Sequence, residues 1–367
     1  MPSLVVRTGT DSTEVTVRTD SLPEIGVHLQ RRIGAATGLQ VVVVTDETVG
    51  DAYGELVVRA LGRAGFYPCI RRFAPGEASK DLATAGELYE FLSARHIGRD
   101  AVIVALGGGV VSDLAGFVAA TWMRGVRFAI CPTTMESAID ASIGGKTAIN
   151  ITGGKNLVGA FHQPILVLVD PTCLRTLSPR DVRAGLAESV KHALISSESF
   201  LEFHEDNAER ILGLDGTVTG ELITANIKIK AGIVEEDVHE RGGRRMVLNL
   251  GHTIGHSIEA CAGFALRHGE CVGLGLLAAC ELSRDRVGLD GSVVERVRAL
   301  LQGFSLPIRL EQAIDADQLL EAMLNDKKVR GGRARFVLLE AIGRPVIRDD
   351  VPEAEVRRVC ESLLVPE

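Results

Sequence analysis

The sequence lacks several features that would place it in a specialised class of proteins. Its seven cysteines are scattered, odd in number and free of any C-x-x-C pair, so we expect neither a disulfide framework nor a structural zinc knuckle. No apolar run approaches the about eighteen residues of a membrane span, and the N-terminus has no charged-then-apolar signal pattern. The net charge of −8 gives no general attraction for nucleic acid or anionic membrane. We therefore expect a cytoplasmic protein that binds neither nucleic acid nor membrane.

The length and composition are those of an ordinary globular protein with about two domains. The 367 residues are 46% hydrophobic and 24% charged, which is enough apolar material for a large core. In the first half, short β-branched runs alternate with helical patterns, as in an open sheet with helices on both faces. From Pro179 onward the apolar residues mostly follow helical spacing. The sequence predicts a Rossmann-like α/β domain with a mostly parallel sheet over 1–178, and an α-helical domain over 179–367.

The individual elements follow from the same spacing. In the first half we expect strands at 39–46, 67–73, 101–106, 126–131 and 165–170, and helices at 52–64, 80–94 and 110–122. In the second half we expect helices at 182–195, 200–212, 220–236, 252–261, 268–286, 292–302 and 316–324, with a strand pair at 334–339 and 344–347.

Three of the nine histidines fall within seventeen residues. On a helix, His252 and His256 stand four residues apart and share one face. His268 begins the next apolar run, so a second helix would bring it back against the first. Any one of them alone is more often an ordinary buried or helix-end histidine. Because imidazole is the commonest neutral metal ligand, the set predicts a metal site.

Glu188 extends this prediction. It shares a helix face with Lys191 at i, i+3, which alone would indicate a surface ion pair. The flanking residues are apolar, however, and a buried carboxylate needs a partner such as a divalent metal. Glu188, His252 and His268 then form a three-ligand site with open positions, as expected of a catalytic zinc. His256 is left for proton transfer or phosphate contact.

Glycines mark where anionic ligands would bind. Gly107, Gly108 and Gly109 follow a buried strand and open a helix, so backbone N–H groups would face a pyrophosphate. A structural glycine turn is the alternative, since the G-x-G-x-x-G fingerprint is absent. Asp46 ends an earlier strand, where a carboxylate accepts hydrogen bonds from a ribose, so a nicotinamide dinucleotide is a reasonable ligand.

Two glycine–lysine turns, at 144–147 and 153–156, provide phosphate-binding chemistry without matching a Walker A loop. A single such turn could be a solvated loop. Five cations interrupt glycine-rich or apolar segments, and each alone is more often a solvated charge; together they favour an anionic substrate. They are Arg124, Lys191, Lys230, Arg245 and Lys327.

Taken in order, these motifs resemble the sugar phosphate cyclase superfamily, and within it the 3-dehydroquinate synthase family most closely. The matching stretches are 75–80, 107–117, 123–128, 132–134, 140–147, 154–156, 159–164, 185–191, 248–256, 268–270 and 326–328. The resemblance runs from about residue 40 to residue 345, nearly the whole chain, and such a series of motifs in one order is specific.

The resemblance implies binding of NAD and a divalent metal, usually zinc, with cobalt as an alternative. It implies a lyase that converts 3-deoxy-D-arabino-heptulosonate 7-phosphate to 3-dehydroquinate and phosphate. NAD transiently oxidises a metal-bound alcohol, phosphate is eliminated, the ketone is reduced again, and an intramolecular aldol step closes the ring. NAD is regenerated in each turnover, and the reaction belongs to aromatic amino acid biosynthesis by the shikimate pathway.

The resemblance also implies a role for individual residues. The metal ligands are Glu188, His252 and His268. The NAD-binding set is Asp46, Glu77, Lys80, Gly108, Gly109, Asp113, Thr133, Thr134, Asp140, Lys155 and Thr176. The substrate-binding set is Arg124, Lys146, Asn156, Lys191, Lys230, Arg245, Asn249, His256 and Lys327, of which Lys146, Lys191, Arg245, Asn249 and His256 are the catalytic candidates. Arg124 matches a residue that reaches the neighbouring subunit's active site, which implies a homodimer.

Three alternatives stay open. The segment 235–243 carries about one residue more than the usual dehydroquinate synthase pattern, and Glu136 stands where the pattern is usually apolar. A sister cyclase of the aminodehydroquinate or 2-deoxy-scyllo-inosose synthase type is therefore the nearest rival. A metal-dependent alcohol dehydrogenase is disfavoured by the two glycine–lysine turns, because simple alcohols need no phosphate cradle. A non-catalytic descendant of a cyclase is disfavoured by the complete set of site positions.

Overall fold

The structure is a computed structural model that describes residues 3–34, 38–263, 265–312, 314–324 and 334–364. It divides into two compact units. The first unit comprises Met1–Leu177 together with Thr219–His239, and the second comprises Ser178–Val218 together with Glu240–Glu367. The sequence expectation placed all of 179–367 in one domain. Most of helix α8 (Gly216–Glu236) instead packs with the first unit, where Lys230 on α8 forms an ion pair with Asp140.

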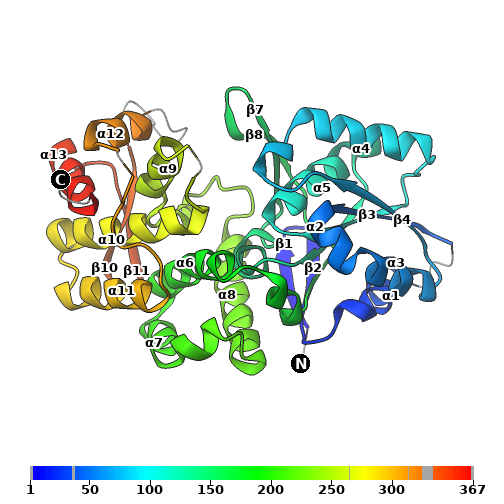
Figure 1. Cartoon of the computed structure of the whole chain (residues 1–367), viewed down its shortest axis with the longest axis horizontal. Helices are drawn as coiled ribbons and strands as arrows, with labels where there is room; N and C mark the ends of the chain where they lie inside the picture. The colour runs from blue at the N-terminus through cyan, green and yellow to red at the C-terminus, as the bar shows by residue number, and fades with distance from the viewer. Residues whose placement is uncertain (1–2, 35–37, 264, 313, 325–333, 365–367) are drawn as a thin grey trace. The chain divides into compact units, whose positions relative to one another are not determined.

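The first unit is built on a seven-stranded sheet, drawn in blue to green in Figure 1. The strand order is β1-β2-β9-β6-β5-β3-β4, and every pairing is parallel except that of β1 with β2. A mostly parallel sheet is thereby confirmed. The strands are β1 (Leu4–Thr8), β2 (Asp11–Val17), β3 (Gln40–Asp46), β4 (Tyr67–Phe73), β5 (Val102–Gly107), β6 (Arg127–Pro132) and β9 (Leu166–Val169).

The centre of this sheet is apolar because its strands are covered on both faces. Every residue of β5 is buried, and β3 is buried apart from its two ends. The covering helices are α1 (Ile25–Ile33), α3 (Glu55–Arg63), α4 (Leu82–Ala94) and α5 (Gly109–Thr121). A three-residue helix, α2 (Glu47–Val49), and a π-helical turn, Gly50–Gly54, precede α3, so the helix expected at 52–64 is irregular at its start.

An antiparallel hairpin, β7 (Lys146–Ile151) with β8 (Gly154–Phe161), lies outside this sheet and was not predicted. The hairpin accounts for the glycines of both glycine–lysine turns, because three of them adopt positive φ where the chain enters or reverses in the hairpin. Gly144 and Gly145 have φ of +105° and +64° just before β7, and Gly154 has φ of +141° at the hairpin turn. Such backbone conformations favour glycine for steric reasons.

The second unit is helical around α10 (His268–Val287), which is buried over most of its length. The helices α6 (Pro179–Ser196), α9 (His252–Cys261), α11 (Gly291–Gly303) and α13 (Glu353–Leu363) and the strand β10 (Phe336–Ala341) all pack on α10. The unit also contains α7 (Glu198–Leu212), α12 (Ala316–Leu324) and β11 (Arg344–Arg348), which pairs with β10. The helix-rich second half is thereby confirmed. Among the described residues, no helix combines the length and apolar character needed to cross a membrane.

Candidate active site

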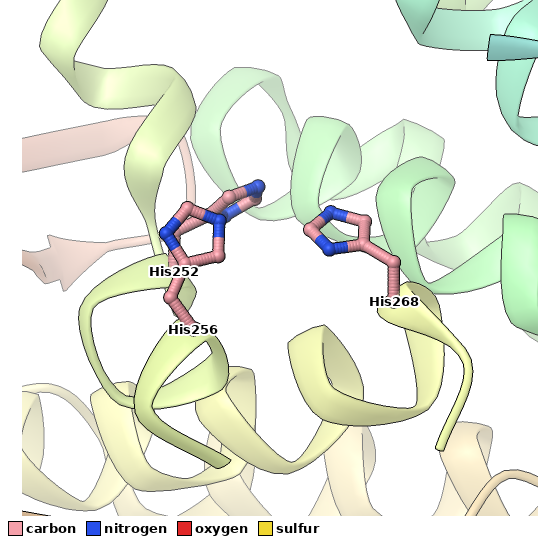
Figure 2. Close-up of side chains that lie close together, drawn as sticks. All are labelled: His252, His256 and His268. Carbon is pink, nitrogen blue, oxygen red and sulfur yellow. The ribbon is translucent and has the colours of Figure 1, made fainter. Parts of the chain in front are cut away.

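Three helices of the second unit carry the predicted metal ligands. Glu188 lies in the middle of α6, His252 is the first residue of α9, and His268 is the first residue of α10. His256 follows His252 by one turn. Figure 2 shows His252 and His256 rising from one helix and His268 from the next, with their imidazole rings turned toward one another. The ring centroids of these three residues lie 5.2–5.7 Å apart.

Glycines bring these helices close enough for the side chains to meet. A Cβ at position 269 would lie 1.8 Å from the carbonyl oxygen of Ala184, so α10 begins against the backbone of α6. A Cβ at position 275 would lie 2.0 Å from the carbonyl oxygen of Gly251, where α9 begins. Both distances are far inside van der Waals contact. The spacing of the three helices therefore depends on glycine at these positions.

An ion pair between Arg180 and Glu270 joins the start of α10 to α6. Arg180, in the first turn of α6, donates to both carboxylate oxygens of Glu270 at 2.6 and 2.7 Å. Glu270 also accepts from the backbone N–H of Arg267 at 2.8 Å, which caps α10. The pKa of Glu270 is lowered: burial acts to raise it, but the hydrogen bonds from Arg180 and Arg267 outweigh that effect. This bidentate pair fixes the backbone on either side of His268.

The carboxylate of Glu188 lies at the distance that a shared metal requires. Its Oε1 is 3.2 Å from Nε2 of His252 and 3.3 Å from Nε2 of His268. A tetrahedral zinc with bonds of about 2.0–2.1 Å separates its ligand atoms by roughly 3.3 Å. The other carboxylate oxygen of Glu188, Oε2, accepts a hydrogen bond from Lys191 Nζ. The two distances from Oε1 to the imidazole nitrogens therefore match the ligand–ligand distance of a tetrahedral zinc site.

Burial and neighbouring charges keep Glu188 and His252 in the protonation states that bind metal. Burial acts to raise the pKa of Glu188, but Lys191 and the two imidazoles outweigh it, so that pKa lies well below its usual range. Burial lowers the pKa of His252 to about 3, against the attraction of Glu188. Its position at the start of a helix, where the dipole is positive, also disfavours a charged imidazole. An ionised carboxylate and a neutral imidazole are the forms that coordinate zinc.

The two ring nitrogens of His252 each face an oxygen, but a neutral imidazole can donate a hydrogen bond to only one of them. A neutral imidazole has a single N–H. Nδ1 of His252 lies 3.1 Å from the carbonyl oxygen of Leu250, while Nε2 faces Glu188 Oε1, and both oxygens only accept. One proton cannot serve both contacts. A divalent cation between Nε2 and Oε1 would satisfy the second contact, so the donor set fits a metal ion.

Two ligand sets are compatible with these positions. Nitrogens of His252, His256 and His268 lie within 4.8 Å of one another, which could serve a three-histidine site. Glu188 lies at tetrahedral spacing from His252 and His268 and adds a negative charge that a divalent cation needs. We favour the set with Glu188, because Lys191 compensates only one of its carboxylate oxygens and the other, Oε1, faces Nε2 of both His252 and His268.

The remaining predicted residues of the second unit differ in exposure. Lys191 and Arg245 are buried, at 2% and 1% exposure, and Asn249 is half-buried. Arg245 and Asn249 lie on a 3₁₀ turn, Arg244–Asn249, that directly precedes Gly251 and α9. Buried cations of this kind suit an anionic ligand. Lys327 lies outside the described residues.

In the first unit, the predicted cofactor residues gather after the carboxyl ends of parallel strands. Asp46 ends β3, Gly108 and Gly109 follow β5, Thr133 and Thr134 follow β6, and Thr176 lies on the turn after β9. Because these strands are parallel, their carboxyl ends meet at one edge of the sheet, where open α/β sheets bind ligands. A Cβ at position 108 would lie 2.8 Å from Thr134 Cγ2, so any larger residue there would require the side chain of Thr134 to shift.

Some of these residues are also bound to the protein itself. Asp46 caps α2 by accepting from Val49 N–H at 2.9 Å. Thr134 Oγ1 accepts from Ser137 N–H at 3.2 Å, and Thr176 Oγ1 lies 3.0 Å from the hydroxyl of Tyr53. These contacts orient the side chains at the sheet edge.

An ion network surrounds Lys80, which is 4% exposed. Its Nζ lies 3.0 Å from Asp113 and 3.2 Å from Glu77, and burial's tendency to lower the pKa of Lys80 is outweighed by these carboxylates. Glu77 also accepts from Asn150 of the hairpin at 2.7 Å and lies 4.0 Å from Lys155. The structure thus brings together Glu77, Lys80, Asp113 and Lys155.

The predicted substrate residues of the first unit do not all share this burial. Lys230 is 7% exposed and donates to Asp140 through both the backbone oxygen, at 2.8 Å, and the carboxylate, at 2.6 Å. Lys146, Asn156 and Arg124 are exposed. Asn156 and Arg124 adopt left-handed backbone conformations, with φ of +54° and +67°.

Three residues with clear roles were missed from the sequence. Arg180 and Glu270 join α6 to α10, and Glu259 lies 3.1 Å from Nδ1 of His268. Glu259 follows His256 by three residues on the same helix, and this helical spacing was the available signal. The pairing of Arg180 with Glu270 spans two helices and leaves no local signal.

Comparison with known proteins shows the same family over both halves of the chain. The family profile for the 3-dehydroquinate synthase N-terminal region matches residues 71–184, and that for the C-terminal region matches residues 185–329. A 3-dehydroquinate synthase of Desulforamulus reducens is 39% identical over 363 residues, covering 99% of this chain and all of that protein.

Solved structures of related cyclases share the fold over the whole chain. A 2-deoxy-scyllo-inosose synthase in complex with carbaglucose-6-phosphate, NAD+ and Co2+ superposes with a TM-score of 0.86 at 26% identity, covering 99% of this chain and 100% of that one. A 2-epi-5-epi-valiolone synthase of Streptomyces hygroscopicus, with NAD+ and Zn2+ bound, superposes with a TM-score of 0.87 at 26% identity, covering 98% and 99%. The sequence identity is higher to the dehydroquinate synthase, and the chain belongs to the 3-dehydroquinate synthase family.

Proposed function

We propose that this protein is a lyase that converts 3-deoxy-D-arabino-heptulosonate 7-phosphate to 3-dehydroquinate and phosphate, as a step of the shikimate pathway. The observation that carries the proposal is the full-length similarity to 3-dehydroquinate synthases, at 39% identity, combined with the approach of Glu188 Oε1 to within 3.2 and 3.3 Å of His252 and His268.

The metal would be held by Glu188, His252 and His268, and it would be zinc or cobalt. The related cyclases contain Zn2+ or Co2+ together with NAD+. When bound, the metal polarises the substrate alcohol and NAD accepts and returns a hydride. The chain's own contribution is to keep Glu188 ionised and the imidazole of His252 neutral. The Lys191 contact supports the first state and burial supports the second.

NAD would bind to the first unit, at the carboxyl edge of the sheet. The glycine turn at the start of α5 presents helix N–H groups to a pyrophosphate. Around it the cofactor set would consist of Asp46, Glu77, Lys80, Gly108, Gly109, Asp113, Thr133, Thr134, Asp140, Lys155 and Thr176.

The substrate would be held mainly by cations, since it carries a phosphate and a carboxylate. In the second unit Lys191, Arg245, Asn249 and His256 would serve, and in the first unit Lys146, Asn156 and Lys230. Lys191 contacts Glu188, so its ammonium would lie close to the metal site and could bind an anionic group of the substrate there. His256 is outside the favoured ligand set, and its imidazole would move or hold a proton on the substrate.

A homodimer would complete the site through Arg124 of each chain. Arg124 and the neighbouring Met123 are exposed in left-handed conformations on a short turn. The hairpin β7–β8 exposes Leu157, Val158 and Phe161, each close to 40%. Apolar side chains in such a cluster are typical of an interface with a second copy.

The protein would be cytoplasmic. The seven cysteines are free thiols, which suits a reducing cytoplasm.

The nearest rival is a sister cyclase, favoured by the fold similarity to 2-deoxy-scyllo-inosose synthase. Purified protein with NAD and zinc would be incubated separately with the heptulosonate phosphate, its amino analogue and glucose 6-phosphate, and inorganic phosphate would be measured. We expect rapid release only from the heptulosonate phosphate. Release from another sugar phosphate, with none from the heptulosonate, would reassign the substrate.

A further inference from the structure

We propose that Glu259 is a positioning residue for the metal site. Its carboxylate accepts the Nδ1–H of His268 and thereby holds that imidazole with Nε2 toward Glu188. The inference rests on the proposed function in one respect, which is that His268 is a metal ligand.

The imidazole of His268 is held between two carboxylates. Oε2 of Glu259 lies 3.1 Å from Nδ1, and Oε1 of Glu188 lies 3.3 Å from Nε2. Glu259 is nearly as buried as a core residue, with its side chain 13% exposed. Since an ionised carboxylate only accepts hydrogen bonds, the proton of a neutral His268 belongs on Nδ1 once a metal occupies Nε2.

The other proposed histidine ligand, His252, is also oriented by a hydrogen bond from Nδ1, but to a backbone carbonyl oxygen instead of a carboxylate. Nδ1 of His252 faces the carbonyl oxygen of Leu250 at 3.1 Å, which the chain itself fixes. His268 is more exposed, at 27% against 11%, and lies at the start of a helix that follows a loop. Its orientation therefore depends on a side chain, and the anionic acceptor makes its Nε2 the more electron-rich ligand.

The position of Glu259 links two of the ligand helices. It lies on α9, seven residues after His252, while His268 begins α10. The contact thus fixes a ligand of one helix from the other. Loss of such an outer hydrogen bond to a metal-bound histidine typically weakens metal affinity about 10–100-fold.

The test uses the full chain, stripped of metal and titrated with zinc against a chromophoric chelator. The variants are Glu259→Ala, which removes the acceptor, and Glu259→Gln, which keeps an acceptor but removes the charge. The control is Glu281→Gln on α10, whose side chain is 11% exposed and contacts Arg298 and Ser362 instead of a histidine. Cobalt loading gives a visible spectrum that reports the ligand geometry directly.

We expect zinc affinity to fall about 10–100-fold in Glu259→Ala, to recover in part in Glu259→Gln, and to stay unchanged in Glu281→Gln. The cobalt spectrum should shift in Glu259→Ala while the unfolding temperature of the metal-free protein stays close to wild type. Wild-type affinity and spectrum in Glu259→Ala would overturn the inference and leave the proposed function intact. An equal loss in Glu281→Gln, or no rescue by glutamine, would overturn it as well. Wild-type protein that binds no divalent metal would instead overturn the proposed metal site itself.

Discussion

Replacing Gly269 by alanine should damage the metal site without touching any ligand. The new Cβ would lie 1.8 Å from the carbonyl oxygen of Ala184, whereas ordinary contacts are 3.4–4 Å. The start of α10 would therefore move away from α6 by roughly 1.5 Å, because close-packed backbone has no room to yield locally. His268 is the residue before Gly269, so its 3.3 Å contact with Glu188 would be lost.

The expected cost follows from this displacement. Overpacking of this kind typically costs about 1–3 kcal/mol, which lowers the unfolding temperature of a domain of this size by roughly 2–12 °C. Zinc affinity should fall at least about tenfold, since misplacing one of three ligands costs more than about 1.4 kcal/mol. Thermal unfolding of the metal-free protein and zinc competition measure the two effects separately.

A matched control lies one turn along the same helix. A Cβ at Gly273 would meet Leu301 Cδ2 at 3.6 Å, an ordinary contact. Gly273→Ala should therefore keep zinc affinity and gain up to about 1 kcal/mol from helix propensity. The reasoning fails if Gly269→Ala binds zinc as tightly as wild type, or if both variants lose affinity alike.

Three further predictions concern protonation and metal. His252→Asn should abolish tight zinc binding while His256→Asn should keep it and lose turnover; zinc titrations that show the reverse would assign the metal to His256. Burial lowers the pKa of His204 to about 4, against about 6.5 in the unfolded chain. The free energy of unfolding is therefore unaffected by this group above about pH 6.5 and decreases as the pH falls toward 4, because the unfolded chain then binds a proton that the folded protein does not. The loss should reach ~3 kcal/mol near pH 4, with a steeper fall in unfolding temperature than in His204→Asn, and parallel curves would contradict it. Removal of metal by a chelator should abolish turnover, and zinc or cobalt should restore it; full activity after chelation would exclude a catalytic metal.

Much of the fold could be predicted because its strongest patterns are local. The β-branched run of β3 and the apolar run of β5 are buried strands in the structure, and the bounds of α9 and α12 agree with the expected ones. The strands β1 and β2 were missed because β1 is only five residues long and β2 contains only two apolar residues, Val15 and Val17. Their place in the sheet depends on pairing between β2 and β9, which are distant in the sequence.

The division of α8 between the two units was also beyond the sequence. A helical pattern shows that a helix has an apolar face but not which unit that face meets. Lys230 and Glu235 contact residues of the first unit, at Asp140 and at the backbone N–H of Arg7. Those partners lie far away along the chain, and only the folded structure brings them together.

The candidate site was predictable in composition and less so in arrangement. The spacing of His252 and His256 showed that they share a helix face, but spacing alone cannot tell which of them meets a carboxylate. That distinction depends on Glu188, which approaches from α6 because Gly269 and the Arg180–Glu270 pair let α10 start there. Long-range packing of this kind leaves no periodic trace in the sequence.

The most direct test of the proposed function is the amount of product formed for each NAD supplied. Purified protein would receive zinc, excess 3-deoxy-D-arabino-heptulosonate 7-phosphate and NAD in no more than equal amount to the protein, and 3-dehydroquinate would be identified and measured against NADH. A cyclase that returns its hydride should form many equivalents of 3-dehydroquinate per NAD with no accumulation of NADH. Product formation that stops once the NAD has been converted to NADH would contradict the proposed function and indicate a dehydrogenase.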